Sequence, residues 1–234
     1  MWISQKKQFL LDILFPKFCI FCKKEGEYVC EDCLSLIEIS EYQFCHLCGK
    51  RIPPDSFCAK CRGKTSLNKL FAATDYKTFV KKIIINCKYK PYIKELSEVL
   101  AFLIINHFSL INNHNILKDC IIIAVPLAKK QEKARGFNQS QEIAKHISKF
   151  FNLLIYSNVL IRTKSKQSQV GLSSNQRKEN VKNVFICKKA NLIKNKKILL
   201  IDDIYTTGST MNECAKILKK AGASQVWGAV VARE

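Results

Sequence analysis

The strongest constraint on the fold lies in residues 198–210, where the sequence is ILLIDDIYTTGST. The four branched apolar residues 198–201 predict a fully buried strand, and Asp202 and Asp203 follow it directly. The next residues are small and rich in hydroxyl groups, and the apolar spacing of 211–220 predicts a helix. Such a turn presents unpaired backbone N–H groups at a helix N-terminus, where a phosphate is stabilised. The adjacent carboxylates predict hydrogen bonds with sugar hydroxyls and a nearby Mg²⁺.

This stretch resembles the phosphoribosyl pyrophosphate (PRPP) motif of type I phosphoribosyltransferases, in which a hydrophobic run precedes an acidic pair and a TTGST-like turn. The resemblance implies that Asp202 and Asp203 bind the ribose hydroxyls and take part in catalysis. It also implies a 5′-phosphate site formed by the turn residues Thr206, Thr207, Gly208, Ser209 and Thr210. Purine-salvage relatives carry an acidic base at the position of Thr206, so we do not expect a hypoxanthine- or guanine-type acceptor.

Eight of the 12 cysteines form four CxxC pairs before residue 62. The N-terminal apolar run is too short for a membrane span and has no cleavage site, so the pairs predict metal ligands rather than disulfides. We favour sequential pairing, which gives a double zinc ribbon with one or two structural Zn²⁺ sites, and interleaved pairing is the alternative. The expected ligands are Cys19, Cys22, Cys30, Cys33, Cys45, Cys48, Cys58 and Cys61.

The first 18 residues predict an amphipathic helix, because Asp12 interrupts the apolar run and Pro16 ends it. We therefore expect a cytoplasmic protein whose membrane contact, if any, is peripheral and at the inner face. Lysine and arginine number 39 against 19 aspartates and glutamates, giving a net charge of +20. This surplus favours phosphorylated or polyanionic partners.

A second predicted strand, 119–126, ends in a loop that precedes the segment RGFNQS and a helix at 141–150. In type I phosphoribosyltransferases such a loop holds pyrophosphate, so the resemblance places Pro126, Leu127 and Arg135 on that side of the site. Residues 162–183 predict a long polar loop of the kind that closes over an active site. Three basic residues are candidates for its contacts, namely Arg162, Lys164 and Arg177.

The string VPL with RGFNQSQEIA is similar to the competence protein F family (ComF/ComFC, also called GntX-like). The resemblance implies an α/β fold, a type I phosphoribosyltransferase-like domain with a mostly parallel sheet and helices on both faces, plus a small N-terminal four-cysteine zinc-ribbon module. We expect the N-terminal helix and double zinc ribbon in 1–66. The second domain, 67–234, is expected to contain a hood at about 70–115 and a PRPP-binding core at about 119–234. Its predicted strands are 71–77, 119–126, 153–161, 197–202 and 225–232.

The same resemblance implies a PRPP-binding protein of natural transformation. It would handle incoming single-stranded DNA on the cytoplasmic side, beside the DNA-uptake machinery at the membrane. Two alternatives stay open at this point. One is an active phosphoribosyltransferase of nucleotide metabolism, and the other is a PRPP-sensing regulator without turnover. The sequence indicates neither an acceptor nor an oligomeric state.

Overall fold

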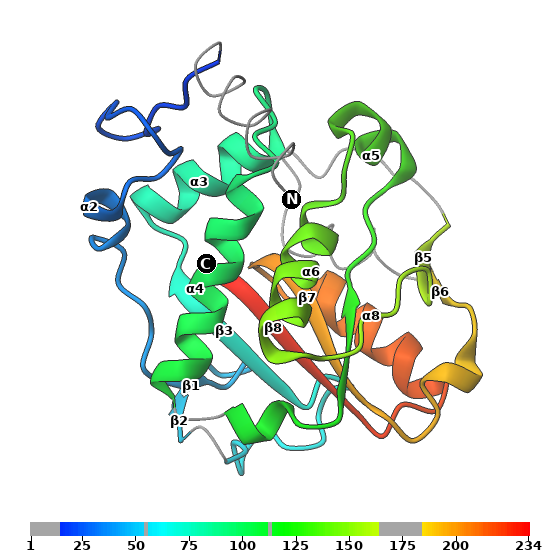
Figure 1. Ribbon diagram of the computed structural model, residues 1–234. Coiled ribbons are helices and arrows are strands. Elements are labelled where there is room, and N and C mark those ends of the chain that lie inside the picture. The colour runs from blue at the N-terminus through cyan, green and yellow to red at the C-terminus, as the bar shows by residue number, and fades with distance from the viewer. Residues whose placement is uncertain (1–14, 54–55, 112–113, 164–183) are drawn as a thin grey trace. The chain divides into compact units, whose positions relative to one another are not determined.

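The computed structural model describes residues 15–53, 56–111, 114–163 and 184–234 (Figure 1). The chain divides into two compact units, one up to Glu38 and one from Ile39 to Glu234. The described part of the first unit holds two CxxC knuckles and one short helix, α2 (Glu31–Leu34). The second unit holds the other two CxxC pairs and a central sheet.

The central sheet has four parallel strands in the order β3-β8-β7-β4. Their bounds are Lys69–Asp75 for β3, Gln225–Arg233 for β8, Lys197–Tyr205 for β7 and Cys120–Ala124 for β4. The strands are near-continuous apolar runs, as expected for a parallel sheet that is covered on both faces. The predicted mostly parallel sheet is therefore confirmed.

Helices cover both faces of this sheet. The helices α4 (Leu96–Leu110) and α6 (Gln139–Phe151) pack on one face and cross it side by side (Figure 1). On that face the ring of Phe71 lies 4.9 Å from that of Phe108, centroid to centroid. On the other face α8 (Ser209–Lys220) packs its buried residues into one apolar cluster with Ile198 and Leu200. Alternate residues of each strand thus enter two separate layers of core.

One predicted strand, 153–161, is not a strand of the parallel sheet. Only Ile155 makes a bridge to Ile122, and the chain then turns at Asn158, whose φ is +62°. It re-emerges as β5 (Leu160–Arg162), which pairs antiparallel with β6 (Phe185–Cys187). The polar Ser157-Asn158 step interrupts the apolar run because these residues favour turns.

The remaining elements are short or connect the larger ones. They are β1 (Gln43–Phe44), β2 (Arg51–Ile52), α3 (Thr78–Lys88), the 3₁₀ turn η1 (His114–Leu117), α5 (Lys129–Arg135) and the 3₁₀ turn η2 (Ala190–Leu192). Across the described ranges, no helix is both long enough and apolar enough to cross a membrane. The amphipathic helix predicted at the N-terminus falls mainly in 1–14, outside the described residues.

Candidate functional site

The acidic pair lies inside β7 rather than after it. The strand continues to Tyr205 because β8 runs beside it as far as Arg233. Successive residues of a strand point to opposite faces, so Asp202 and Asp203 have different neighbours. Together they mark the carboxyl end of the sheet, where open α/β folds bind their ligands.

Asp202 is held from the N-terminus of α6. The hydroxyl of Ser140 donates to its Oδ1 at 2.9 Å, and the backbone N–H of Asp203 donates to the same oxygen at 3.0 Å. Burial, followed by the charge of Asp203, raises the pKa of Asp202 to about 7. This carboxyl therefore changes its charge near neutral pH. Ser140 is a site residue that the sequence did not identify, because its position also suits an ordinary helix cap.

Asp203 is buried and forms an ion pair with the last residue of α3. Its Oδ1 lies 2.8 Å from the Nζ of Lys88, and the two side chains are 4% and 21% exposed. Its other oxygen, Oδ2, is buried and has no hydrogen-bond partner within the described part of the chain. A buried oxygen of this kind is costly unless a ligand satisfies it. Lys88 falls within the predicted hood, and the sequence did not identify it as a site residue.

The five predicted phosphate-loop residues form the turn after β7 and the first two residues of α8. Gly208 has φ +70° and is the residue before α8, whose first turn begins at Ser209. The hydroxyls of Thr207 and Ser209 lie 2.7 Å apart, which orders the turn. A Cβ added at Gly208 would lie 2.1 Å from the hydroxyl oxygen of Tyr205, so this position requires glycine.

Tyr205 connects the phosphate loop to the second cysteine cluster. Its ring lies under Gly208, and its hydroxyl donates to the backbone oxygen of His46 at 3.3 Å. His46 stands between two predicted metal ligands, Cys45 and Cys48. The second cysteine cluster and the predicted phosphate loop are therefore both in contact with the Tyr205 side chain.

The second predicted loop follows β4 and is fixed next to β7. The backbone N–H of Val125 donates to the backbone oxygen of Ile201 at 2.9 Å. The side-chain amide of Asn138 donates to the backbone oxygen of Val125 at 3.0 Å. Asn138 also caps α6 by accepting from the N–H of Ser140 at 3.1 Å. Pro126 and Leu127 begin the loop, and both are partly exposed.

Of the four predicted basic residues, the structure describes two, and they lie on separate elements. Arg135 ends α5, and its Nη1 donates to the side-chain oxygen of Gln139. Arg162 ends β5 with its guanidinium 5.7 Å from the centroid of the Phe185 ring. Burial lowers the pKa of Arg162, while the charges of Cys214 and Asp202 oppose that shift. Two further candidates, Lys164 and Arg177, lie outside the described residues.

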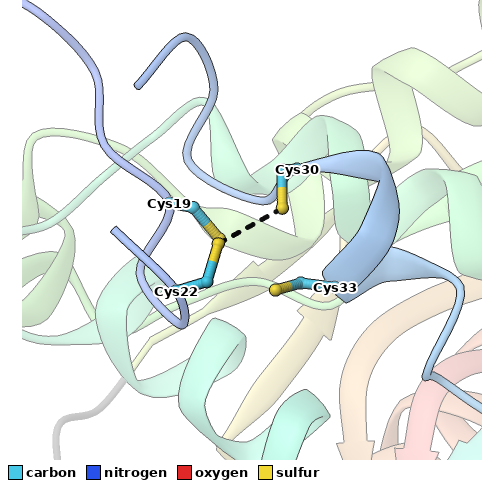
Figure 2. Close-up of side chains that lie close together, drawn as sticks. All are labelled: Cys19, Cys22, Cys30 and Cys33. Atoms are coloured by element: carbon cyan, nitrogen blue, oxygen red, sulfur yellow. Dashed lines mark hydrogen bonds between the residues drawn. The ribbon is translucent and has the colours of Figure 1, made fainter. Parts of the chain in front are cut away.

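The eight predicted cysteine ligands form two clusters of four. Cys19, Cys22, Cys30 and Cys33 make the first cluster, and Figure 2 shows their sulfur atoms converging from two short segments. Cys45, Cys48, Cys58 and Cys61 make the second. Within each cluster the ligand atoms all lie within 4.8 Å of one another. Sequential pairing is therefore confirmed, and four converging thiols fit a tetrahedral Zn²⁺.

Comparisons with known proteins agree with both halves of this description. A family model described as double zinc ribbon domain matches residues 10–62, and one described as phosphoribosyl transferase domain matches 136–234. The first segment is thus similar to a double zinc ribbon, and the second to a phosphoribosyl transferase domain. Among solved structures, the allosteric regulatory enzyme of purine biosynthesis matches 58% of this chain and 24% of its own at 17% identity. Its TM-score is 0.37.

Curated relatives point to one family. Competence protein F of Haemophilus influenzae is 37% identical over 110 residues, which are 46% of this chain and 48% of that protein. DNA utilization protein YhgH of Escherichia coli K12 is 35% identical over 108 residues, 45% of this chain and 47% of its own. Competence protein ComFC of Streptococcus pneumoniae is 34% identical over 113 residues, 47% of this chain and 46% of its own. The predicted resemblance to the competence protein F family is confirmed, and the chain spans about half the length of the curated relatives it matches.

Proposed function

We propose that this double-zinc-ribbon phosphoribosyl transferase-like protein binds PRPP at the carboxyl end of β7. The observation that supports this most is the acidic pair beside the phosphate loop. Asp203 keeps one buried oxygen without a partner in the described chain, and the loop at 206–210 offers backbone donors at the N-terminus of α8. A sugar phosphate carries hydroxyl donors for the carboxylates and an anionic group for the loop.

In this proposal the residues bind and orient the ligand through hydrogen bonds and form no covalent bond with it. Asp202 and Asp203 accept hydrogen bonds from the ribose hydroxyls, and Thr207, Ser209 and the loop N–H groups hold the 5′-phosphate. The loop after Val125 lies toward the pyrophosphate. The acidic pair also fits a Mg²⁺ ion, which binds carboxylate and phosphate oxygens and would neutralise the pyrophosphate charge.

Titration calorimetry with Mg–PRPP tests the proposal. We expect binding by the zinc-loaded protein, and a loss of at least about 100-fold in Asp202→Asn/Asp203→Asn, since both hydrogen-bond acceptors lose their charge and gain a donor that faces the ribose hydroxyls. The control is Asp75→Asn, which removes an exposed carboxylate from the end of β3 at the same side of the sheet. Equal affinity in the double variant and the control would contradict the proposal.

We also infer a role in handling single-stranded DNA during natural transformation. The names of two relatives, competence protein F and DNA utilization protein YhgH, support this process. The net charge of +20 supports a polyanionic partner. We expect a nucleic-acid backbone to contact the zinc ribbons and residues 77–94, which hold six lysines and no acidic residue.

Fluorescence anisotropy with a labelled single-stranded oligonucleotide tests this role. Because binding would release counterions, the logarithm of the association constant should fall linearly with the logarithm of salt, by about 0.7 for each phosphate contacted. Duplex DNA of the same sequence is the control. Affinity that does not change with salt, or that is absent at low salt, would count against the role.

Phosphoribosyl transfer is the second candidate, and one observation favours it. Asp203 is shielded from solvent, at 3% exposure, and transfer from PRPP needs a site from which water is excluded. Pyrophosphate release from PRPP would then depend on an added acceptor. A screen of bases and amines that yields no acceptor-dependent release would leave binding as the function.

A further inference from the structure

The two cysteine clusters lie in segments of opposite charge. Residues 15–38, which hold the first cluster, contain three lysines against five acidic residues, a balance of −2. Residues 39–66, which hold the second, contain five lysines and arginines against two acidic residues, a balance of +3. A Zn²⁺ held by four thiolates would add about −2 to each segment, so the difference between them stays the same. A polyanionic ligand is therefore favoured at the second ribbon over the first.

A cavity of about 140 Å³ lies between the second ribbon and the amino end of the central sheet. The ribbon contributes Phe57 and Arg62 to its lining, and the starts of β3 and β8 contribute Lys69 and Gln225. Three cysteines of the second cluster border it too, and the cavity extends from them to the sheet. Since one water-sized group needs about 10–15 Å³ of such space, the cavity has room for one nucleobase.

Phe57 holds two cations at this cavity. The amine of Lys69 lies 4.8 Å from the centroid of the Phe57 ring, and the guanidinium carbon of Arg62 lies 5.1 Å from it. Lys69 is buried, whereas Arg62 is exposed. A guanidinium that is held against an aromatic ring presents a flat, charged surface on which an unpaired base can stack. Arg62 and Phe57 therefore form a stacking platform beside the cavity.

Gln225 supplies a hydrogen-bond acceptor at the same cavity. Its side-chain oxygen, Oε1, is buried and has no partner within the described ranges of the chain. A buried acceptor of this kind is costly unless a ligand donates to it. Every DNA base carries an N–H donor on its Watson–Crick edge, and that edge is free only when the base is unpaired. The acceptor therefore suits a single strand better than a duplex.

We propose that this cavity is a base-binding site for single-stranded DNA, an inference that rests on the proposed handling of single-stranded DNA. One unpaired base stacks on Arg62 and Phe57 and directs its N–H edge toward Gln225. The flanking phosphates contact exposed basic residues of the second ribbon, Lys60 and Lys64. The first ribbon takes no part. The base site lies at the opposite end of the sheet from the proposed PRPP site.

Fluorescence anisotropy with two labelled strands of equal length and charge tests this, one strand complete and the other abasic. Zinc-loaded wild type should bind the complete strand more tightly. Arg62→Gln should reduce that preference by about 5-fold or more, because the stacking surface for one base is lost.

Two matched controls separate stacking from charge. Arg51→Gln removes an exposed guanidinium 4.5 Å from the Tyr42 ring in the same ribbon, at a position outside the lining of the cavity. It should weaken the binding of both strands alike and keep the preference. Lys17→Gln removes an amine 5.9 Å from the Tyr28 ring in the first ribbon and should leave both affinities unchanged.

The outcomes separate the base site from the role in DNA handling. If wild type binds single strands but binds both equally, or if Arg62→Gln keeps the full preference, the base site is refuted and the role stands. If wild type binds neither strand, both are refuted. Photocrosslinking of wild type to a strand that contains iodouracil, analysed by mass spectrometry, needs no variant. Adducts should form on Phe57 or on His46, which also lines the cavity, and adducts confined to the first ribbon would overturn the inference.

Discussion

Replacing Gly208 by alanine tests whether the phosphate loop is built on Tyr205. Gly208 has φ +70°, and the added Cβ would lie 2.1 Å from the Tyr205 hydroxyl oxygen and 2.3 Å from its Cζ. Both atoms belong to a ring that is buried and cannot rotate away freely. To accept the methyl group the ring must move, and its hydrogen bond to the oxygen of His46 must lengthen or break.

The cost has two parts that can be estimated separately. A non-glycine residue in the left-handed region costs about 1–2 kcal/mol. Overpacking against a buried ring adds about 1–3 kcal/mol. Gly136 provides the matched control, because its φ is +84° and nothing lies within 4 Å of an added Cβ. Gly136→Ala should therefore lose only the stability associated with the left-handed backbone. Gly208→Ala should be less stable than Gly136→Ala by about 1–3 kcal/mol, because it also carries the overpacking cost.

Urea unfolding of both zinc-loaded variants, followed by tryptophan fluorescence, measures the two losses. A double variant, Gly208→Ala with Tyr205→Leu, removes the ring and should show a favourable coupling energy in a double-mutant cycle. Gly208→Ala should also weaken PRPP binding, since the loop donors move. Equal losses in Gly208→Ala and Gly136→Ala, with no coupling to position 205, would refute the packing argument.

Three further outcomes are expected. The pKa of Asp202 is raised from 3.8 to about 7 in the folded protein, so its contribution to stability is fully present below about pH 4 and is lost as pH rises through 7. Urea unfolding across this range should show wild type losing stability relative to Asp202→Asn, and parallel curves of the two proteins would contradict the prediction. Cys58→Ser should weaken PRPP binding by about 5-fold or more, because the second zinc cluster holds His46, whose backbone oxygen accepts from Tyr205. Cys30→Ser, in the first cluster, is the control, and equal effects of the two variants in calorimetry would exclude that coupling. Leu200→Ala, at a fully buried position of β7, should lower the free energy of unfolding by about 2–5 kcal/mol in urea titrations, and a loss below about 1 kcal/mol would contradict its place in the core.

The parts of the fold that the sequence predicted well are those with strong local signals. The apolar run before Asp202, the small-residue turn and the helix after it are all present as β7, the loop and α8. The cysteine spacing likewise predicted two clusters, since a CxxC turn directs both thiols to the same side. In each case the determining contacts lie within a few residues of one another.

The parts that it missed depend on distant contacts. No local pattern shows that β7 continues through Asp203, because that extension depends on pairing with β8. The same is true of Lys88 and Ser140, which reach the aspartates from α3 and α6. A lysine near a turn and a serine near a helix start are common in solvent-exposed positions, so only the three-dimensional arrangement identifies them. The strand predicted at 153–161 failed for the opposite reason, since a short polar turn outweighed a long apolar pattern.

The order of the strands also determines how the chain can fold. β8 lies between β3 and β7, and Lys69 of β3 pairs with Trp227 of β8 across most of the sequence. During synthesis β3 and the apolar helices after it leave the ribosome long before β8 exists. Such non-local pairing slows folding and leaves apolar strand edges unprotected in the meantime. The candidate site, which needs β7 supported by β8, therefore forms only after β8 has been made.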